Sequence, residues 1–229
     1  MKSLLIIGAG QYGQLVKELA EDCGYEKIAF LDDNSPIAIG KVAEAECFRA
    51  DYAEVVIAIG NPSVREKVVS ELEPVFRLAT LIHPTAFVSR SAVTDSGCII
   101  EPGAVVQTGA RLGKACIINA GAVVNHNSTV ECFSQVDCNA IVAARALVPK
   151  GTKVESGTVW GYDVVNLCEN GLNFSRAYDI ISLLRIGACF GVDLRLSLFI
   201  QCMFLFEIDR NCGNQRGYVH KTGEDACKE

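Results

Sequence analysis

The chain has 229 residues, half of them hydrophobic, and its formal net charge at pH 7 is −6. This length allows one or two small domains with hydrophobic cores, and the composition is that of an ordinary soluble protein. The acidic balance argues against nucleic acid or an anionic membrane as the main partner.

The first segment predicts a buried strand rather than a secretory signal. Residues 3–8 are apolar, but the run stops at the turn Gly8-Ala9-Gly10-Gln11-Tyr12-Gly13 and is too short for the apolar region of a signal peptide. A helix-like stretch follows over residues 14–23, and a second apolar run over 27–31 ends in Asp32 and Asp33. This order predicts a βαβ unit whose glycines let backbone amides approach a phosphate at a helix N-terminus. Asp32 is then expected to accept a hydrogen bond from a ribose hydroxyl.

A third predicted strand over residues 55–59 runs into Gly60 and Asn61, and a helix is expected over residues 64–72. A short strand near residues 76–79 then completes an α/β domain that spans residues 1–80. Eighty residues are about half of a full dinucleotide fold, so binding of a nucleotide or nucleotide-sugar is favoured over NAD-dependent hydride transfer. A purely structural glycine turn is the remaining alternative.

Residues 81–158 form thirteen consecutive rows of six without insertion or deletion. The second position is Ile, Val or Leu in twelve rows, with Thr94 the exception, and the sixth is always Ala, Cys, Ser or Thr. The fifth is Gly in six rows and Asn in two, which are residue types that tolerate left-handed backbone angles. These columns predict a left-handed parallel β-helix over residues 81–160, with eighteen residues per triangular coil and coils about 4.8 Å apart.

Eleven cysteines are spread over the chain without a C-x-x-C pair, so no metal site is predicted. Cys98 and Cys116 stand at the small sixth position, where Cys behaves as a slightly larger Ala. In the absence of a signal peptide, we expect reduced thiols and a cytoplasmic protein. Carbonic anhydrases that share this β-helix need three metal-binding histidines, and the repeat contains only His83 and His126.

His126 is the candidate general base. It stands at the fourth position of its row, next to a turn and outside the aliphatic column, so it is expected to face outward. Acyl transfer from a thioester needs such a base and donors for the developing oxyanion. Because one coil is eighteen residues, Ala144 stacks over His126, and its backbone N–H is the candidate donor. The same spacing aligns a second outward column, which consists of His83, Glu101, Asn119, Asp137 and Glu155.

The combined motifs resemble the sialic acid O-acetyltransferase and UDP-amino-sugar (bacillosamine) N-acetyltransferase family. The resemblance covers residues 1 to about 160 and rests on the glycine turn, Phe30-Leu31-Asp32-Asp33, Ala58-Ile59-Gly60-Asn61 with Arg65, Ile82-His83-Pro84, and Asn125-His126. It implies a trimeric enzyme that transfers the acetyl group of acetyl-CoA to a nucleotide-sugar.

The resemblance, together with the stacking of the repeat, indicates roles for individual residues. His126 is expected as the base, with Asn127 and Asn119 beside it. The expected acetyl-CoA contacts are Gln135, Asp137 and Ala144. The expected nucleotide-sugar contacts are Gly8, Gly10, Tyr12, Gly13, Asp32, Asp33, Gly60 and Asn61. The chain departs from the family pattern at Tyr12, where His is frequent, and at Asn127, where an acidic residue is usual and where an amide cannot stabilise an imidazolium by charge.

The expected function is therefore acetyl-CoA-dependent transfer to an amino or hydroxyl group of a nucleotide-sugar or a sialic-acid-like sugar. Two alternatives stay open: an acyltransferase for an amino acid or another small metabolite, and a catalytically silent protein that binds sugar nucleotides. A homotrimer is predicted from small and apolar outward residues, for example Val105, Val123, Ile141 and Ala143.

The segment 161–229 carries no repeat and is assigned no function. Its apolar stretch 196–206 is too short to span a bilayer. Helices packed on the β-helix or the trimer, an interfacial membrane contact and an appended foreign sequence are the readings that the sequence leaves open.

Overall fold

The computed structural model describes residues 1–161. The segment 161–229, with its three alternative readings, therefore lies outside the described residues except for its first residue. In the described part, no helix is long and apolar enough to cross a membrane.

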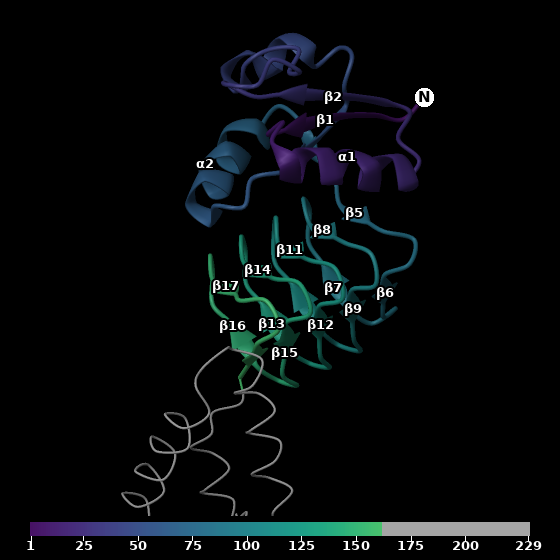
Figure 1. Ribbon diagram of the computed structural model, residues 1–229, viewed down its shortest axis with the longest axis vertical. Coiled ribbons are helices and arrows are strands. Elements are labelled where there is room, and N and C mark those ends of the chain that lie inside the picture. The colour runs from purple at the N-terminus through teal and green to yellow at the C-terminus, as the bar shows by residue number, and fades with distance from the viewer. Residues whose placement is uncertain (162–229) are drawn as a thin grey trace, which may run out of the picture. The chain divides into compact units, whose positions relative to one another are not determined.

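The first 78 residues form a parallel sheet with two main helices, as the βαβ pattern predicted (Figure 1). The strands lie in the order β2-β1-β3-β4, with all three pairings parallel. Their bounds are β1 Ser3–Ile7, β2 Lys27–Leu31, β3 Glu54–Ile57 and β4 Arg77–Leu78. Residues 4–7 of β1 are fully buried. A strand that is covered on both faces of a sheet is apolar throughout, which explains the continuous apolar run in the sequence.

The helices begin earlier than the sequence predicted. Helix α1 spans Gln11–Asp22 and α2 spans Pro62–Leu72, so α1 starts inside the glycine turn itself. Pro62 at the first helical position and the Asn61 cap fix the start of α2, a pattern in which proline loses no helical hydrogen bond. A short 3₁₀ helix, η1 at Val42–Phe48, was not predicted.

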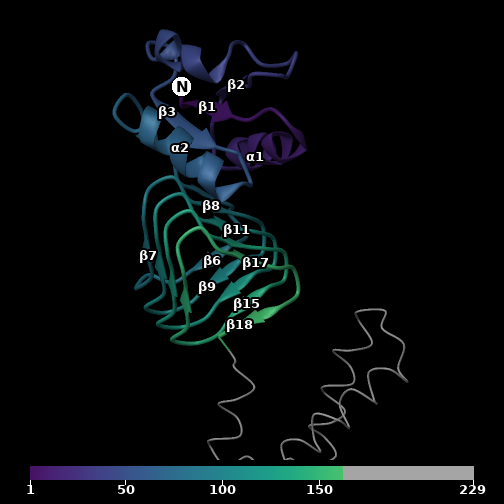
Figure 2. The same cartoon turned by 90° about the vertical axis from the view of Figure 1, so that its left-hand side faces the viewer.

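The repeat forms the predicted parallel β-helix, with one two-residue strand in each row of six. Three parallel sheets make its sides, in the orders β17-β14-β11-β8-β5, β18-β15-β12-β9-β6 and β16-β13-β10-β7. Figure 2 shows the coils nested behind one another. The strand bounds are β5 Leu81–Ile82, β6 Phe87–Val88, β7 Val93–Thr94, β8 Ile99–Ile100, β9 Val105–Val106, β10 Arg111–Leu112, β11 Ile117–Ile118, β12 Val123–Val124, β13 Thr129–Val130, β14 Gln135–Val136, β15 Ile141–Val142, β16 Leu147–Val148, β17 Lys153–Val154 and β18 Val159–Trp160.

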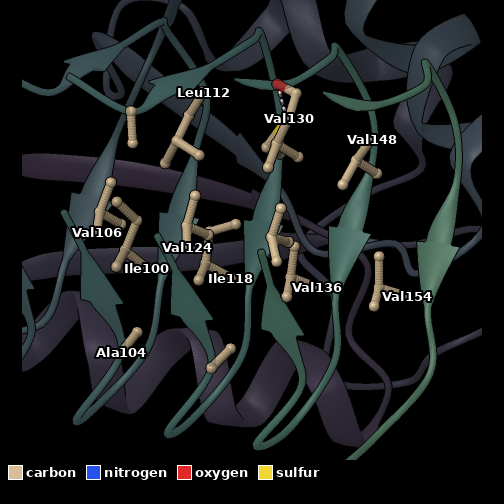
Figure 3. Close-up of a cluster of buried hydrophobic side chains, with 14 of the residues drawn as sticks. Ile100, Ala104, Val106, Leu112, Ile118, Val124, Val130, Val136, Val148 and Val154 are labelled. Atoms are coloured by element: carbon tan, nitrogen blue, oxygen red, sulfur yellow. Dashed lines mark hydrogen bonds between the residues drawn. The ribbon is translucent and has the colours of Figure 1, made fainter. Parts of the chain in front are cut away.

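The second-position side chains fill the interior of the β-helix. Figure 3 shows Val106, Leu112, Val124 and Val130 among the side chains that point inward from successive strands. From Ile100 onward every second-position residue up to Val154 is at most 2% exposed. The first coil, at the end of the stack, is less covered, and Ile82 is 38% exposed.

The fifth position of each row turns the chain in the left-handed conformation, as predicted. From the third row to the thirteenth every fifth residue has a positive φ, and five of these eleven are not glycine. These five are Ala115, Asn127, Phe133, Asn139 and Arg145. Because a side chain in this conformation is strained, the stacked coils rather than the residue type impose the turn here.

The α/β domain packs on the sheet that contains β5, β8 and β11. Val16 and Leu19 of α1 share one apolar cluster with Leu81, Ile99 and Ile117, which are the outward first-position residues of those strands. Figure 1 shows α1 next to β5 and β8. This outward face is therefore covered, and Ile99 and Ile117 are each only 1% exposed.

Arg65 joins α2 to the β-helix. The side chain is 1% exposed, and its guanidinium donates to the carbonyl oxygens of Ile59, Gly60, Ala115 and Phe133. The last two belong to left-handed corners of successive coils. Burial lowers the pKa of Arg65. A guanidinium has enough N–H groups to satisfy these carbonyls at once, so one side chain fixes α2 against two coils.

Candidate active site

The predicted nucleotide-sugar residues gather at one edge of the α/β sheet. The glycine turn follows β1, Asp32 and Asp33 follow β2, and Gly60 and Asn61 follow β3. These three strands are neighbours in one parallel sheet. Ligands of open α/β sheets bind at the carboxyl ends of the strands, so the structure brings these residues together where such a site is expected.

The glycines in this edge differ in what they do. Gly8 has φ of +100°, and an added Cβ on Gly13 would lie 2.1 Å from the Gly8 carbonyl oxygen, so the fold requires both. Added Cβ atoms on Gly10 and Gly60 would meet nothing within 4 Å. Gly10 also has an ordinary φ of −70°, and no side chain caps the helix that it begins. Open space beside uncapped N–H groups is what an approaching phosphate needs.

The two acidic residues and Asn61 are engaged in local structure. Asp32 accepts the N–H of Ala9 at 2.8 Å and the N–H of Asn34 at 2.8 Å, and these bonds lower the pKa of its carboxyl. Asp33 accepts the N–H of Val42 at 3.1 Å. Asn61 Oδ1 caps α2 through two backbone N–H groups. A ligand hydroxyl at Asp32 would therefore donate to a carboxylate that also accepts the two backbone N–H groups of the glycine turn and its neighbour.

His126 lies where the sequence predicted, exposed in the turn after β12. Its Nδ1 is 3.2 Å from Asn127 Nδ2, so the neighbouring amide contacts the imidazole. Register pairs β12 with β15, which places Ala144 beside His126 in the next coil. The N–H groups of Ala143 and Arg145 donate to Trp160 and His126, whereas the exposed Ala144 N–H meets no acceptor among residues 1–161. A base and a free donor thus adjoin at one corner.

Three other predicted residues lie at a different corner. Asn119, Gln135 and Asp137 stand on or after β11 and β14, in the sheet that the α/β domain covers, whereas His126 follows a strand of the next sheet. In a single chain Asn119 is therefore not a neighbour of His126. Asp137 binds Lys153 at 3.1 Å and the Cys138 N–H at 2.9 Å; although burial acts to raise it, these bonds hold the pKa of Asp137 below its ordinary range.

Two residues of the outward column that contains Asn119 are buried. Glu101 is 2% exposed and Asn119 is 6% exposed. Glu101 Oε1 accepts a hydrogen bond from Asn119 Nδ2 at 2.6 Å, and Asn119 Oδ1 accepts one from Gln135 Nε2 at 2.8 Å. The sequence aligned Glu101 and Asn119 by their spacing of eighteen, but it carried no signal that the α/β domain would cover these two residues.

Tyr12 enters the same buried region from the start of α1. Its hydroxyl is buried and has no hydrogen-bond partner among the described residues. Burial raises the pKa of Tyr12, and the nearby Glu101 carboxylate raises it further. Tyr12 and Glu101 therefore belong to one polar cluster between the α/β domain and the β-helix, which the sequence did not indicate.

The second histidine of the repeat supports the chain locally. His83 Nδ1 accepts the Thr85 N–H at 3.0 Å, and Nε2 is 3.2 Å from an oxygen of Asp22 at the end of α1. Both ring nitrogens are engaged, so His83 anchors α1. Within residues 1–161, no group of three His, Cys, Asp or Glu side chains could hold a metal ion.

The comparisons with known proteins agree with the fold described above. Residues 3–72 match the PglD N-terminal domain family. The chain is similar to the acetyltransferase domain of PglB from Neisseria gonorrhoeae FA1090, with 28% identity over 72% of this chain and 93% of that one at a TM-score of 0.64. A second structure of that domain, in complex with acetyl coenzyme A, has 30% identity over 69% and 87% at a TM-score of 0.56.

A third similar structure is GDP-perosamine N-acetyl transferase from Caulobacter crescentus in complex with CoA and GDP-perosamine. It has 22% identity over 69% of this chain and 93% of that one, at a TM-score of 0.50, and supports the fold. The α/β domain, the hexapeptide β-helix and these matches define the class as a hexapeptide-repeat acyltransferase. The chain belongs to the family of the PglB acetyltransferase domain, and its residues 3–72 form a PglD-type N-terminal domain.

Proposed function

We propose that the protein transfers the acetyl group of acetyl-CoA to an amino or hydroxyl group of a nucleotide-sugar, with His126 as the general base. The observation that carries the proposal is the adjacency of the exposed His126 imidazole and the free Ala144 N–H at one corner of successive coils. The similar PglB domain binds acetyl coenzyme A, which supports the choice of acyl donor.

The proposed reaction needs little more than this pair. His126 takes a proton from the acceptor amine or hydroxyl as its nitrogen or oxygen attacks the thioester carbonyl carbon. The Ala144 N–H donates to the developing oxyanion. The carbon–sulfur bond then breaks, and the departing thiolate of CoA receives the proton from His126. Acetylated acceptor and CoA are the two products.

The sugar nucleotide is proposed to bind at the α/β sheet edge, in the part of the chain that residues 1–80 form. Gly10, Gly60 and the uncapped start of α1 offer space and N–H donors for the diphosphate. Asp32 is placed to receive a ribose hydroxyl beside its two backbone bonds. The acyl chemistry belongs to residues 81–160, so the nucleotide part of the acceptor and acetyl-CoA occupy separable regions, and only the sugar meets the thioester.

A trimer would bring the two corners of the β-helix into one site. His126 and the Asn119–Gln135 corner are separated in a single chain, so a site that uses both needs a neighbouring copy. One outward column, Phe87, Val105, Val123, Ile141 and Val159, is apolar through five coils in strict register. Phe87 is 59% exposed and Val159 49% exposed, whereas Ala143, which was also expected to face a partner, is buried. An apolar column of this length is typical of a subunit contact.

A binding and turnover screen tests the proposed function. UDP-, GDP- and CMP-linked amino-sugars are each titrated into the full chain, and release of the CoA thiol is followed with acetyl-CoA present. We expect acetyl-CoA and at least one sugar nucleotide to bind, and thiol release only when both are present. The contrary outcome is turnover of serine or another small metabolite with acetyl-CoA, with sugar nucleotides left unchanged. That result would replace the proposed function by an acyltransferase for an amino acid or another small metabolite.

A further inference from the structure

A directed chain of hydrogen bonds runs from a buried carboxylate to the edge of the α/β domain. Glu101 accepts from Asn119 Nδ2 at 2.6 Å and from the Ala120 N–H at 2.9 Å. Asn119 then accepts from Gln135 Nε2 at 2.8 Å. An ionised carboxylate only accepts hydrogen bonds, so it fixes the orientation of the Asn119 amide, and Asn119 in turn fixes that of Gln135.

This orientation leaves the carbonyl oxygen of Gln135 as the outer end of the chain. Gln135 Oε1 accepts no hydrogen bond within residues 1–161, and the side chain is half-buried. In its outward column the preceding positions, among them Ile99 and Ile117, are buried beneath α1, whereas the following residue Lys153 is exposed. Gln135 therefore stands where the cover of α1 ends, near the turn that begins this helix.

The surroundings of Glu101 explain why this series of hydrogen bonds would affect how a ligand binds at its outer end. Glu101 is 2% exposed, and burial raises the pKa of its carboxyl against the lowering effect of its hydrogen bonds. The Tyr12 hydroxyl lies close by, buried and without a partner. Hydrogen bonds that point in series toward a negative group polarise one another, which makes the carbonyl at the far end a stronger acceptor.

We propose that Gln135 Oε1 binds an N–H or O–H group of the acceptor sugar, and that Glu101 is a positioning residue that acts through Asn119. The inference rests on the proposed function and assigns Gln135 to the sugar rather than to acetyl-CoA. It also defines a specificity: the site selects a sugar with a hydrogen-bond donor at this position over the deoxy analogue, because an acceptor that loses its water when the ligand binds and gains no partner is unfavourable.

Two nearly isosteric substitutions test the inference in the full-length protein. Gln135→Met removes the carbonyl, and Glu101→Gln removes the charge that orients the chain. Each is expected to raise the KM for the sugar nucleotide about 10-fold, the effect of one hydrogen bond of about 1.4 kcal/mol, and to leave the KM for acetyl-CoA unchanged. Glu155→Gln, an exposed carboxylate of the same column, is the matched control and should change neither KM.

The double variant separates positioning from general damage to the fold. If Glu101 acts through Gln135, the double variant has the KM of Gln135→Met alone, because coupled sites are not additive. Effects that multiply to about 100-fold, or a Gln135→Met protein with wild-type KM, would overturn the inference. Gln135→Met keeps the test decisive if Glu101→Gln fails to fold.

Direct binding distinguishes this inference from the proposed function. Sugar nucleotides are titrated by calorimetry without acetyl-CoA into the wild-type and Gln135→Met proteins. Wild-type binding without any acetyl transfer overturns the proposed function alone, and the Gln135 assignment is then judged from binding. Equal binding by both proteins overturns the inference alone. A wild-type chain that binds no sugar nucleotide overturns both.

Discussion

At the scale of single residues, Asp32 and Asn127 each contact a backbone or ring that the proposed chemistry needs. Asp32 closes the glycine turn by accepting the N–H groups of Ala9 and Asn34. Asn127 Nδ2 lies 3.2 Å from Nδ1 of the His126 ring. Asn127 was expected beside His126, whereas the backbone partners of Asp32 were not indicated by the sequence, and both contacts give predictions with a pH dependence.

Asp32→Asn is expected to lower the free energy of unfolding at pH 7 by about 1–2 kcal/mol. Each carboxylate oxygen of Asp32 accepts one backbone N–H, whereas an amide has only one oxygen. The folded-state pKa of Asp32 lies below the ordinary 3.8. Its stabilisation is therefore complete above about pH 4 and is lost as pH falls through the folded-state value. Urea unfolding from pH 7 to pH 2 should show the difference between the two proteins shrinking only in acid. A constant difference would contradict this role of the carboxylate.

Asn127→Asp tests the contact with His126. In the structure Asn127 Nδ2 faces the ring Nδ1, an orientation that leaves the ring proton on Nε2; rotation of the amide by half a turn reverses this. A carboxylate only accepts, so it holds the proton on Nδ1 and frees Nε2 to act as base. The acid limb of the kcat profile should then move to higher pH, because an adjacent negative charge favours imidazolium. An unchanged profile would show that Asn127 does not bear on the base.

At the scale of elements, the start of α1 leaves space for a ligand phosphate to approach its backbone N–H groups. Gly10→Ser should cap α1 with its hydroxyl, so the melting temperature should hold or rise. The same side chain fills the open space and occupies the N–H groups, so sugar-nucleotide affinity should fall about 10-fold. Gly13→Ala is the matched control for stability. Its Cβ would lie 2.1 Å from the Gly8 oxygen, so this variant should be destabilised by the about 1–3 kcal/mol that overpacking costs. If Gly10→Ser leaves calorimetric affinity intact, phosphate does not bind there.

The sequence predicted the elements better than their mutual packing. The period of six specified the β-helix and its left-handed corners, because each coil repeats one local solution that neighbouring coils stabilise. The βαβ order likewise predicted β1, α1 and β2. The starts of α1 and α2 were placed too late because glycine and proline were read as turn residues, although both are compatible with a helix start.

The residues of the candidate site likewise divide into those that the sequence predicted and those that it did not. His126 and Ala144 were found because their positions follow from the repeat. Arg65 could have been recognised as buried, since it shares the apolar face of α2 with Val68, Val69 and Leu72. The burial of Glu101 and Asn119 could not, because it depends on how α1 packs across the β-helix, and no local pattern encodes that contact.

At the scale of the whole molecule, the apolar column from Phe87 to Val159 predicts a homotrimer. Val123 is its central member, and Val123→Asp would place a charge within the contact, where an unpaired buried charge is strongly unfavourable. Light scattering at micromolar concentration should give a trimer for the wild-type chain and a monomer for the variant, with much reduced turnover. A clean wild-type monomer would contradict the shared site.

The proposed reaction depends on His126 as the base, and a comparison of two histidines tests this role. His126→Ala should lower kcat for acetyl transfer to a sugar nucleotide by about 10²–10⁴, with an unchanged melting temperature because the side chain is exposed. His83→Ala removes the contacts with Asp22 and Thr85 and should lower the melting temperature while kcat stays near that of the wild type. A His126→Ala enzyme that turns over at a near wild-type rate would show that His126 is not the base.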